Sequence, residues 1–179
     1  LAVDLQKSDT ITLGLGGTSG VRTITSNRVV KTDYNSANLA KTDIKINGEN
    51  MLSADYTVDL SSASNAAGLM ATAINLNTGV HGAVADAFNT VTSKPKGDFK
   101  MTTTFAVNSA TINIATSYTE LVANINEAAS GINAKLNTDN TITLSNDDGD
   151  DIVLAALSSG AGITDVGFTA STYSGFIGI

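Results

Sequence analysis

Four aspartates stand out as the side chains of this sequence that could do chemistry together. Asp147, Asp148, Asp150 and Asp151 surround Gly149. Carboxylates grouped in this way could hold Ca²⁺, a hard cation that prefers oxygen ligands. The ligand spacing of an EF-hand loop is absent, however, and so is a closing glutamate at the right distance. We therefore expect a solvated hairpin tip here, with a Ca²⁺ site as the weaker alternative.

His81 is the only histidine, which excludes any site that needs two imidazoles. A catalytic triad could nominally combine His81 with Asp86 and one of the many serines. No nucleophile elbow or oxyanion-hole motif supports such a triad. We expect His81 at a strand edge or on the surface. The sequence predicts that the protein is not an enzyme and uses no cofactor.

The composition limits the possible partners. The net charge of −7 and the ten scattered basic residues argue against nucleic acid, because phosphate binding needs clustered Lys and Arg. No stretch reaches the ~18 apolar residues that a membrane helix requires. The absence of cysteine excludes disulfides and thiolate metal sites. The chain opens at Leu1 in the middle of an alternating pattern, so it resembles a piece of a longer protein.

One pattern occurs twice, in residues 66–80 and 118–132. In each copy two large apolar residues stand four positions apart, followed by an asparagine, a glycine and a β-branched residue. This order predicts a helix with one apolar face, which a glycine in the left-handed conformation ends and a strand follows. The positions are Met70, Ile74, Asn75, Gly79 and Val80 in the first copy, and Leu121, Ile125, Asn126, Gly131 and Ile132 in the second.

The residues before each helix are also alike. Each helix follows a predicted strand, 56–60 in the first copy and 111–114 in the second. Further upstream, Ile46-Asn47-Gly48 predicts a type I′ hairpin turn, and Val107-Asn108-Ser109 stands at that place in the second copy. Candidate helix caps are Ser61, Ser62 or Ser64 in the first copy, and Ser117 with Glu120, which form a capping box, in the second.

The rest of the chain predicts short strands. Hairpins are expected in residues 1–15, between 83–85 and 90–93, and between 132–136 and 141–145. Single strands are expected at 21–30, 43–46, 100–107, 152–157, 168–170 and 176–179. Lys94-Pro95-Lys96-Gly97 holds the only proline and is the best candidate boundary.

The predicted fold class is therefore α+β, mainly β. It consists of two similar strand–helix–strand or hairpin units, each with one amphipathic helix packed on a small antiparallel sheet. Residues 1–96 would form a first β-rich subdomain with repeat unit one at about 42–93. Residues 97–179 would form a second with repeat unit two at about 99–170.

The repeated pattern carries a family resemblance. Ile46-Asn47-Gly48 with Ala73-Ile74-Asn75 and Thr78-Gly79-Val80 resembles the repeat named after its Ile-Asn pair in bacterial flagellins. The stretches 143–149 and 167–170 also resemble flagellin central regions. The second copy departs from the pattern at Ser109, and it has one more residue between Asn126 and Gly131.

The resemblance implies a structural protein of the bacterial flagellum, used in motility. Such a central region projects from the extracellular filament surface, while terminal helices, which this sequence lacks, bind other flagellin subunits. The resemblance also allows O-linked glycans on exposed Ser or Thr. The isolated fragment would be a monomer whose two chain ends lie close together. No nucleic-acid or membrane partner is expected.

Two alternatives remain. The protein that caps the flagellar filament shares the repeat and works at the growing tip. An extracellular adhesin or carbohydrate-binding module would need exposed aromatic rings for sugars, and the chain has four Tyr, five Phe and no Trp. Long helical segments in the flanking sequence of the parent chain would favour flagellin over both.

Overall fold

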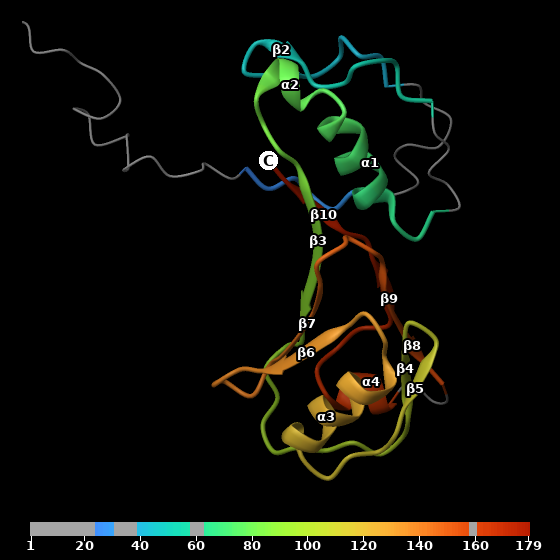
Figure 1. The fold of residues 1–179 in the computed structure, drawn as a ribbon. Coiled ribbons are helices and arrows are strands. Elements are labelled where there is room, and N and C mark those ends of the chain that lie inside the picture. Colours follow the sequence, from blue (N-terminus) through green and yellow to red (C-terminus); the bar gives the residue numbers. More distant parts are fainter. Residues whose placement is uncertain (1–23, 31–38, 58–62, 158–160) are drawn as a thin grey trace, which may run out of the picture.

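The computed structural model describes residues 24–30, 39–57, 63–157 and 161–179 (Figure 1). Within these residues the chain consists mainly of small antiparallel sheets with four short helices. The predicted α+β class, dominated by β structure, is therefore confirmed. The predicted hairpin of residues 1–15 lies outside the described residues, as do parts of the strands predicted at 21–30 and 56–60.

Sheet I has the strand order β10-β3-β7-β6, with every neighbouring pair antiparallel. Its strands are β3 (Asp86–Thr92), β6 (Asn133–Leu136), β7 (Ile142–Asn146) and β10 (Phe176–Gly178). The predicted hairpin of β6 and β7 is confirmed, with Leu136 opposite Ile142. The hairpin predicted between 83–85 and 90–93 is wrong. Strand β3 is continuous, and its first half pairs with β10 while its second half pairs with β7.

Sheet II has the order β5-β4-β8-β9 and is also antiparallel throughout. Its strands are β4 (Phe105–Val107), β5 (Ala110–Ile112), β8 (Ile152–Ala156) and β9 (Ser171–Tyr173). The strand predicted at 168–170 is wrong. Phe168 is buried, and its N–H bonds the Ile163 carbonyl at 3.1 Å, so it closes the end of a helix that the sequence did not reveal, α4 (Ala161–Asp165).

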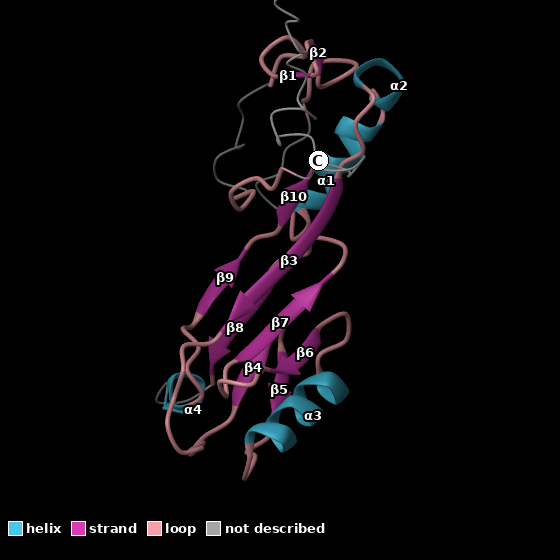
Figure 2. Cartoon of the chain, turned by 90° about the vertical axis from the view of Figure 1, so that its left-hand side faces the viewer, coloured by secondary structure: helices cyan, strands magenta, loops and turns pink. Residues whose placement is uncertain are grey.

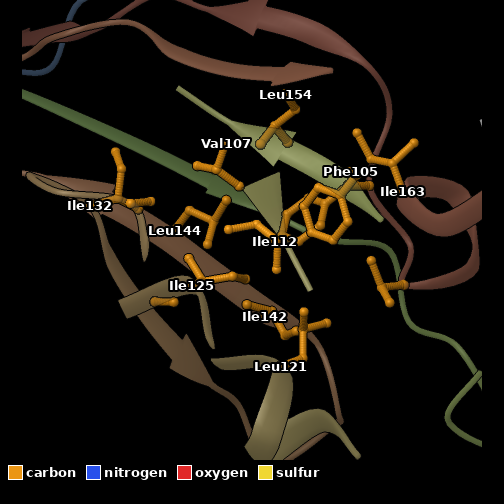
Figure 3. Packing of buried hydrophobic residues seen from close by; sticks show 14 of the residues in the cluster. Phe105, Val107, Ile112, Leu121, Ile125, Ile132, Ile142, Leu144, Leu154 and Ile163 are labelled. Carbon is orange, nitrogen blue, oxygen red and sulfur yellow. The ribbon is translucent and has the colours of Figure 1, made fainter. Parts of the chain in front are cut away.

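The larger hydrophobic core lies between the two sheets, and we call it the C-terminal cluster. Helix α3 (Tyr118–Ala128) contacts β6 and β5, the edge strands of sheet I and sheet II, and so covers one side of this core (Figure 2). Leu121 and Ile125 point into it and are fully buried, as predicted (Figure 3). The other labelled members are Phe105, Val107, Ile112, Ile132, Ile142, Leu144, Leu154 and Ile163.

A second core, the N-terminal cluster, lies under helix α1 (Ala66–Asn75), which packs on β3 and β10. Met70 and Ile74 are 3% and 2% exposed, so both are buried as predicted. The small hairpin of β1 (Lys45–Ile46) and β2 (Glu49–Asn50) stands beside the short helix α2 (Thr78–His81). The members of the cluster are Val29, Met51, Leu52, Ala66, Ala67, Met70, Ala71, Ile74, Ala85 and Ile177.

Strand β3 belongs to both cores. It runs from the α1 region down into the sheets beside α3 (Figure 2). Ala85, just before the strand, lies in the N-terminal cluster, and Val91 lies in the C-terminal cluster. Strand pairing therefore crosses the predicted boundary at 96/97, because β7 and β10 come from beyond it. The division into subdomains 1–96 and 97–179 stays a prediction.

The first and last residues that the structure describes lie side by side. The Ile24 N–H donates to the Ile179 carbonyl at 2.7 Å, and the Ile179 N–H donates to the Ile24 carbonyl at 2.9 Å. The following residues continue along β10, with Ser26 bonded to Ile177 and Val29 bonded to Gly175. The described chain therefore starts and finishes at one place. Leu1 itself lies outside the described residues.

The N-terminal cap of α3 was predicted correctly from the sequence, whereas that of α1 was not. Ser117 accepts from the Glu120 N–H at 3.1 Å, as predicted. The Glu120 carboxylate bonds the hydroxyl and backbone N–H of Thr116 instead of Ser117, and these bonds lower its pKa. The serine cap predicted for α1 is wrong. Its cap is Asn65, whose side-chain oxygen accepts from the Gly68 N–H at 2.9 Å.

The end of the first helix also differs from the prediction. Gly79 lies inside α2, and Gly82 takes the left-handed conformation instead, with φ of 73°. Val80, predicted to open a strand, is in the same helical turn and is 58% exposed. In this extra turn the Asn77 carbonyl accepts from the N–H groups of Val80 at 2.9 Å and His81 at 3.3 Å. In the second copy, Gly131 has the predicted positive φ, at 78°, and Ile132 is buried before β6.

The two motif glycines should therefore respond oppositely to substitution. Gly131→Val should lower the free energy of unfolding by at least ~1 kcal/mol, because a β-branched residue tolerates the left-handed region poorly. Gly79→Ala should raise it by roughly 0.5–1 kcal/mol, since alanine favours a helix and nothing lies within 4 Å of the added Cβ. Urea denaturation measures both changes. Equal effects at the two positions would contradict the backbone assignment.

Candidate functional site

The acidic loop lies at the junction of the two cores. It connects β7 of sheet I to β8 of sheet II, so it is a crossing between sheets and no hairpin tip. Asp151 is 7% exposed, and its N–H donates to the Ser64 carbonyl at 2.7 Å. A Cβ at Gly149 would lie 2.7 Å from the Cβ of Ala87 and 3.1 Å from that of Ala67. The prediction of a solvated tip is therefore wrong for the inner half of this loop.

The same loop does not gather its carboxylates around one point. Asp147 and Asp148 are exposed, and Asp148 accepts from the Asp150 N–H at 3.0 Å. Among the residues that the structure describes, no group of three or more His, Cys, Asp or Glu side chains is arranged to hold a metal ion. The four aspartates named as the Ca²⁺ candidate therefore lie in one loop, but they are not arranged to bind a single ion.

The charged form of the Asp150 side chain is unfavourable in this loop. Burial raises its pKa, and the charges of Asp148 and Asp151 raise it further. The folded protein therefore holds the Asp150 proton more tightly than the unfolded chain does. The resulting stability is fully present below the unfolded pKa and is lost as the pH rises through the folded pKa.

Asp150→Asn should accordingly raise the melting temperature at neutral pH, because it removes a charge that the folded state disfavours. The gain should shrink as the pH falls through the raised pKa, where wild-type Asp150 becomes neutral as well. Asp147→Asn removes the same charge from an exposed neighbouring position and is the matched control. Thermal denaturation at several pH values measures the difference. A gain that does not depend on pH would contradict the assignment.

A buried polar network connects this loop to both sheets. Asn89 of β3 is 1% exposed, and its amide nitrogen donates to the carbonyls of Asp150 at 2.8 Å and Tyr173 at 2.6 Å. Asn146, at the end of β7, donates to the Asp150 carbonyl at 2.9 Å and accepts from the Gly149 N–H at 3.1 Å. These two asparagines satisfy backbone groups at the place where the chain leaves one sheet for the other.

Arg28 completes the network from the other side. Its guanidinium donates to the Asn89 side chain at 2.8 Å, to the Thr90 carbonyl at 2.7 Å and to the Ser174 carbonyl. It also lies over the rings of Phe176, at 4.5 Å from the centroid, and Tyr173, at 5.3 Å. Burial lowers its pKa, and the nearby Tyr173 opposes that shift. Arg28 thus fastens the segment 24–30 to β3 and to the β9–β10 connection.

Sequence reasoning missed Arg28, Asn89 and Asn146. Each is a polar residue within or beside a short apolar pattern, which is also how an outward-facing strand residue looks. The partners of Arg28 and Asn89 come from 61 to 146 positions away in the sequence, whereas Asn146 bonds Gly149 and Asp150, three and four positions away. The local pattern contains no signal for the distant contacts of Arg28 and Asn89.

The two motif asparagines make the same pair of contacts. The Asn75 side chain donates to the Ala85 carbonyl and accepts from the Ala85 N–H, both at 2.8 Å. Asn126 donates to the Ala134 carbonyl at 3.0 Å and accepts from the Ala134 N–H at 2.7 Å. Each asparagine therefore joins the end of its helix to the backbone of the strand that follows.

The two predicted turns are also alike in the backbone. Asn47 and Gly48 have φ of 53° and 87°, and Asn108 and Ser109 have φ of 48° and 69°. Positive φ at both central residues is typical of a type I′ turn, so the predicted turn at Asn47-Gly48 is confirmed. Each turn joins two adjacent antiparallel strands, β1 to β2 and β4 to β5.

His81 has a structural environment. It is 2% exposed, which contradicts the predicted surface or edge position. Its Nε2 lies 3.2 Å from the Ile74 carbonyl, and its Nδ1 accepts from the Ala83 N–H at 3.1 Å. These contacts fit a neutral ring with the proton on Nε2. Both nitrogens of the buried ring thus have a backbone partner, Ile74 in α1 and Ala83 just after α2.

Three hollows border these elements. An apolar one of about 370 Å³ is lined by side chains of the N-terminal cluster, including Met70 and Ile177, and by Leu39, which packs against that cluster. A hollow of about 350 Å³ with a mixed lining lies between Ser64, Asn108 and Asp150, and a polar one of about 320 Å³ lies between Asn75 and Asp147. Neither of these two hollows is lined by an aromatic ring, so neither offers the stacking platform expected of a sugar site.

Within the described residues, no helix has both the length and the apolar character needed to cross a bilayer. Neither a protein-family model, nor a curated protein, nor a solved structure matches the chain.

Proposed function

We propose that this chain is a structural protein, the surface-exposed central region of a bacterial flagellin. One observation carries the proposal: Ile24 and Ile179 are joined by two backbone hydrogen bonds. A region that projects from a filament between two polymerising segments must leave and return at one place. The side-by-side position of these residues meets that requirement.

The sequence motif and the contacts of its residues support the same proposal. We infer that the chain contains two copies of one unit, made of a type I′ hairpin, an amphipathic helix and a strand that the motif asparagine fastens. Asn47 corresponds to Asn108, and Asn75 corresponds to Asn126. Ile74 and Ile125 precede those asparagines and are both buried. The copies differ at their helix ends, where Gly79 does not correspond to Gly131.

A structural role also fits the polar residues that the structure describes. The most buried of them, including Asn89 and His81, bond to backbone groups within the fold. Under this proposal the protein is no enzyme, and it lies on the extracellular surface of the filament. It meets other subunits through helices that this sequence lacks, and O-linked glycans on exposed Ser or Thr are compatible with that position.

Antibodies raised against this chain would test the proposal by electron microscopy of filaments from the source cells. Labelling along the whole filament supports the flagellin assignment. Labelling confined to filament tips supports the alternative, the cap protein. Labelling of the cell surface without filaments supports an adhesin. Sedimentation of the isolated chain provides a second test, because a central region without polymerising helices should be monomeric.

A further inference from the structure

The contacts of Asn126 have a meaning beyond holding helix α3 in place. Strand β6 is the last strand of sheet I in the order β10-β3-β7-β6. The N–H and C=O of its residue Ala134 bond the Asn126 side chain, so they face away from β7. Asn126 is itself exposed, while Ala134 is 5% exposed. The amide of Asn126 therefore lies between the free edge of the sheet and the solvent.

A side-chain amide carries the same donor and acceptor as a peptide group. A further strand beside β6 would offer Ala134 one carbonyl and one N–H, and Asn126 offers it both. The neighbouring outward N–H, that of Ile132, bonds the Ala129 carbonyl at 3.2 Å. At Ala134 the amide of Asn126 thus takes the place that a residue of an additional strand would occupy.

The first copy repeats this arrangement. The pairing of β3 with β7 ends at Asn89 opposite Asn146, so Ala85 lies beyond its reach. The Ala85 N–H and C=O bond the exposed Asn75. The backbone groups of two buried alanines, Ala134 in β6 and Ala85 just before β3, are thus covered by two exposed asparagines. Unpaired strand edges are sites at which other chains add strands, and natural proteins cover or blunt them.

We propose that Asn126 keeps the free β6 edge of sheet I closed to strand addition by a second copy of this chain. The sequence of β6 shows why a second copy is the occupant. In an antiparallel pair of two β6 strands centred on Ala134, the two Ala134 residues exchange the bonds that Asn126 now makes. Asn133 of each strand then lies opposite Lys135 of the other, so no like charges oppose the pairing.

Asn126→Ala should release this edge. We expect the variant to sediment as a dimer at concentrations where the wild-type chain is monomeric. In dilute monomer, hydrogen exchange at the Ala134 amide should be roughly tenfold faster than in the wild type, because one net hydrogen bond is lost. Asn124→Ala is the matched control, since Asn124 lies on the same helix and its amide is 3.5 Å from the Asn113 carbonyl.

Two further variants make the test specific. Adding Asn133→Lys to Asn126→Ala places like charges opposite each other in the dimer, so it should restore the monomer. Asn126→Asp keeps the side-chain size but cannot donate to the Ala134 carbonyl, and it should also promote association if Asn126→Ala fails to fold. The proposal is overturned if folded Asn126→Ala or Asn126→Asp stays monomeric, or if Asn133→Lys does not reverse the association. None of these outcomes depends on where the protein lies in the cell.

Discussion

Replacing Asn89 with leucine should lower the free energy of unfolding by about 3 kcal/mol, since three hydrogen bonds of a buried side chain are lost at roughly 1 kcal/mol each. The substitution leaves the carbonyl of Tyr173 without its amide donor, and Arg28 loses one of its acceptors. Leucine fills nearly the same space, so the loss of stability comes from the missing hydrogen bonds and not from a cavity. Chemical denaturation measures the change.

Asn133→Leu is the matched control, because Asn133 also lies on a strand of sheet I but is exposed. Its effect should stay within about 0.5 kcal/mol, the range of surface substitutions. Equal losses at the two positions would show that the network around Asn89 contributes nothing particular to the fold.

Leu121→Ala should destabilise the protein by about 3 kcal/mol, within the 2–5 kcal/mol range for a leucine truncated in a packed core. Leu121 is fully buried in the C-terminal cluster (Figure 3), whereas Leu76 is 75% exposed, so Leu76→Ala is the control. Because β3 belongs to both cores, the N-terminal cluster should unfold in the same transition. Circular dichroism together with hydrogen exchange at residues of α1 measures this.

Two separate transitions would contradict that expectation. They would show that residues 1–96 and 97–179 unfold as independent subdomains, as the position of Pro95 predicts. A single transition that moves to lower denaturant in Leu121→Ala would show that the strand pairing across residue 96 makes the two cores one cooperative unit.

Local signals foretold the elements whose partners are close in the sequence. The apolar spacing of Met70 and Ile74, and of Leu121 and Ile125, identified both long helices and their buried faces. Turn chemistry identified the Asn47-Gly48 hairpin and the β6–β7 hairpin. In each of these, the residues that decide the structure lie within a few positions of one another.

The remaining features depend on distant partners. The prediction placed a hairpin where the structure has the single strand β3. The partners that make β3 continuous are distant in the sequence: its first half pairs with β10, some 90 positions away, and its second half pairs with β7. The acidic loop looked like a solvated tip because charged residues usually are exposed, yet the backbone around Gly149 packs against Ala67 and Ala87. Asn75 and Asn126 were recognised as a pattern, but their bonds to Ala85 and Ala134 could be seen only in three dimensions.

The backbone pair between Ile24 and Ile179 also determines how the fold responds to mechanical force. Because the two residues lie side by side and antiparallel, tension between them breaks their hydrogen bonds one after another instead of shearing many at once. While this pair holds, a steady pull between these two positions is borne by the pair and not by either hydrophobic cluster. Under the proposed function, drag from flowing liquid would be transmitted to the filament at this one place, so the domain would swing as a whole instead of being stretched.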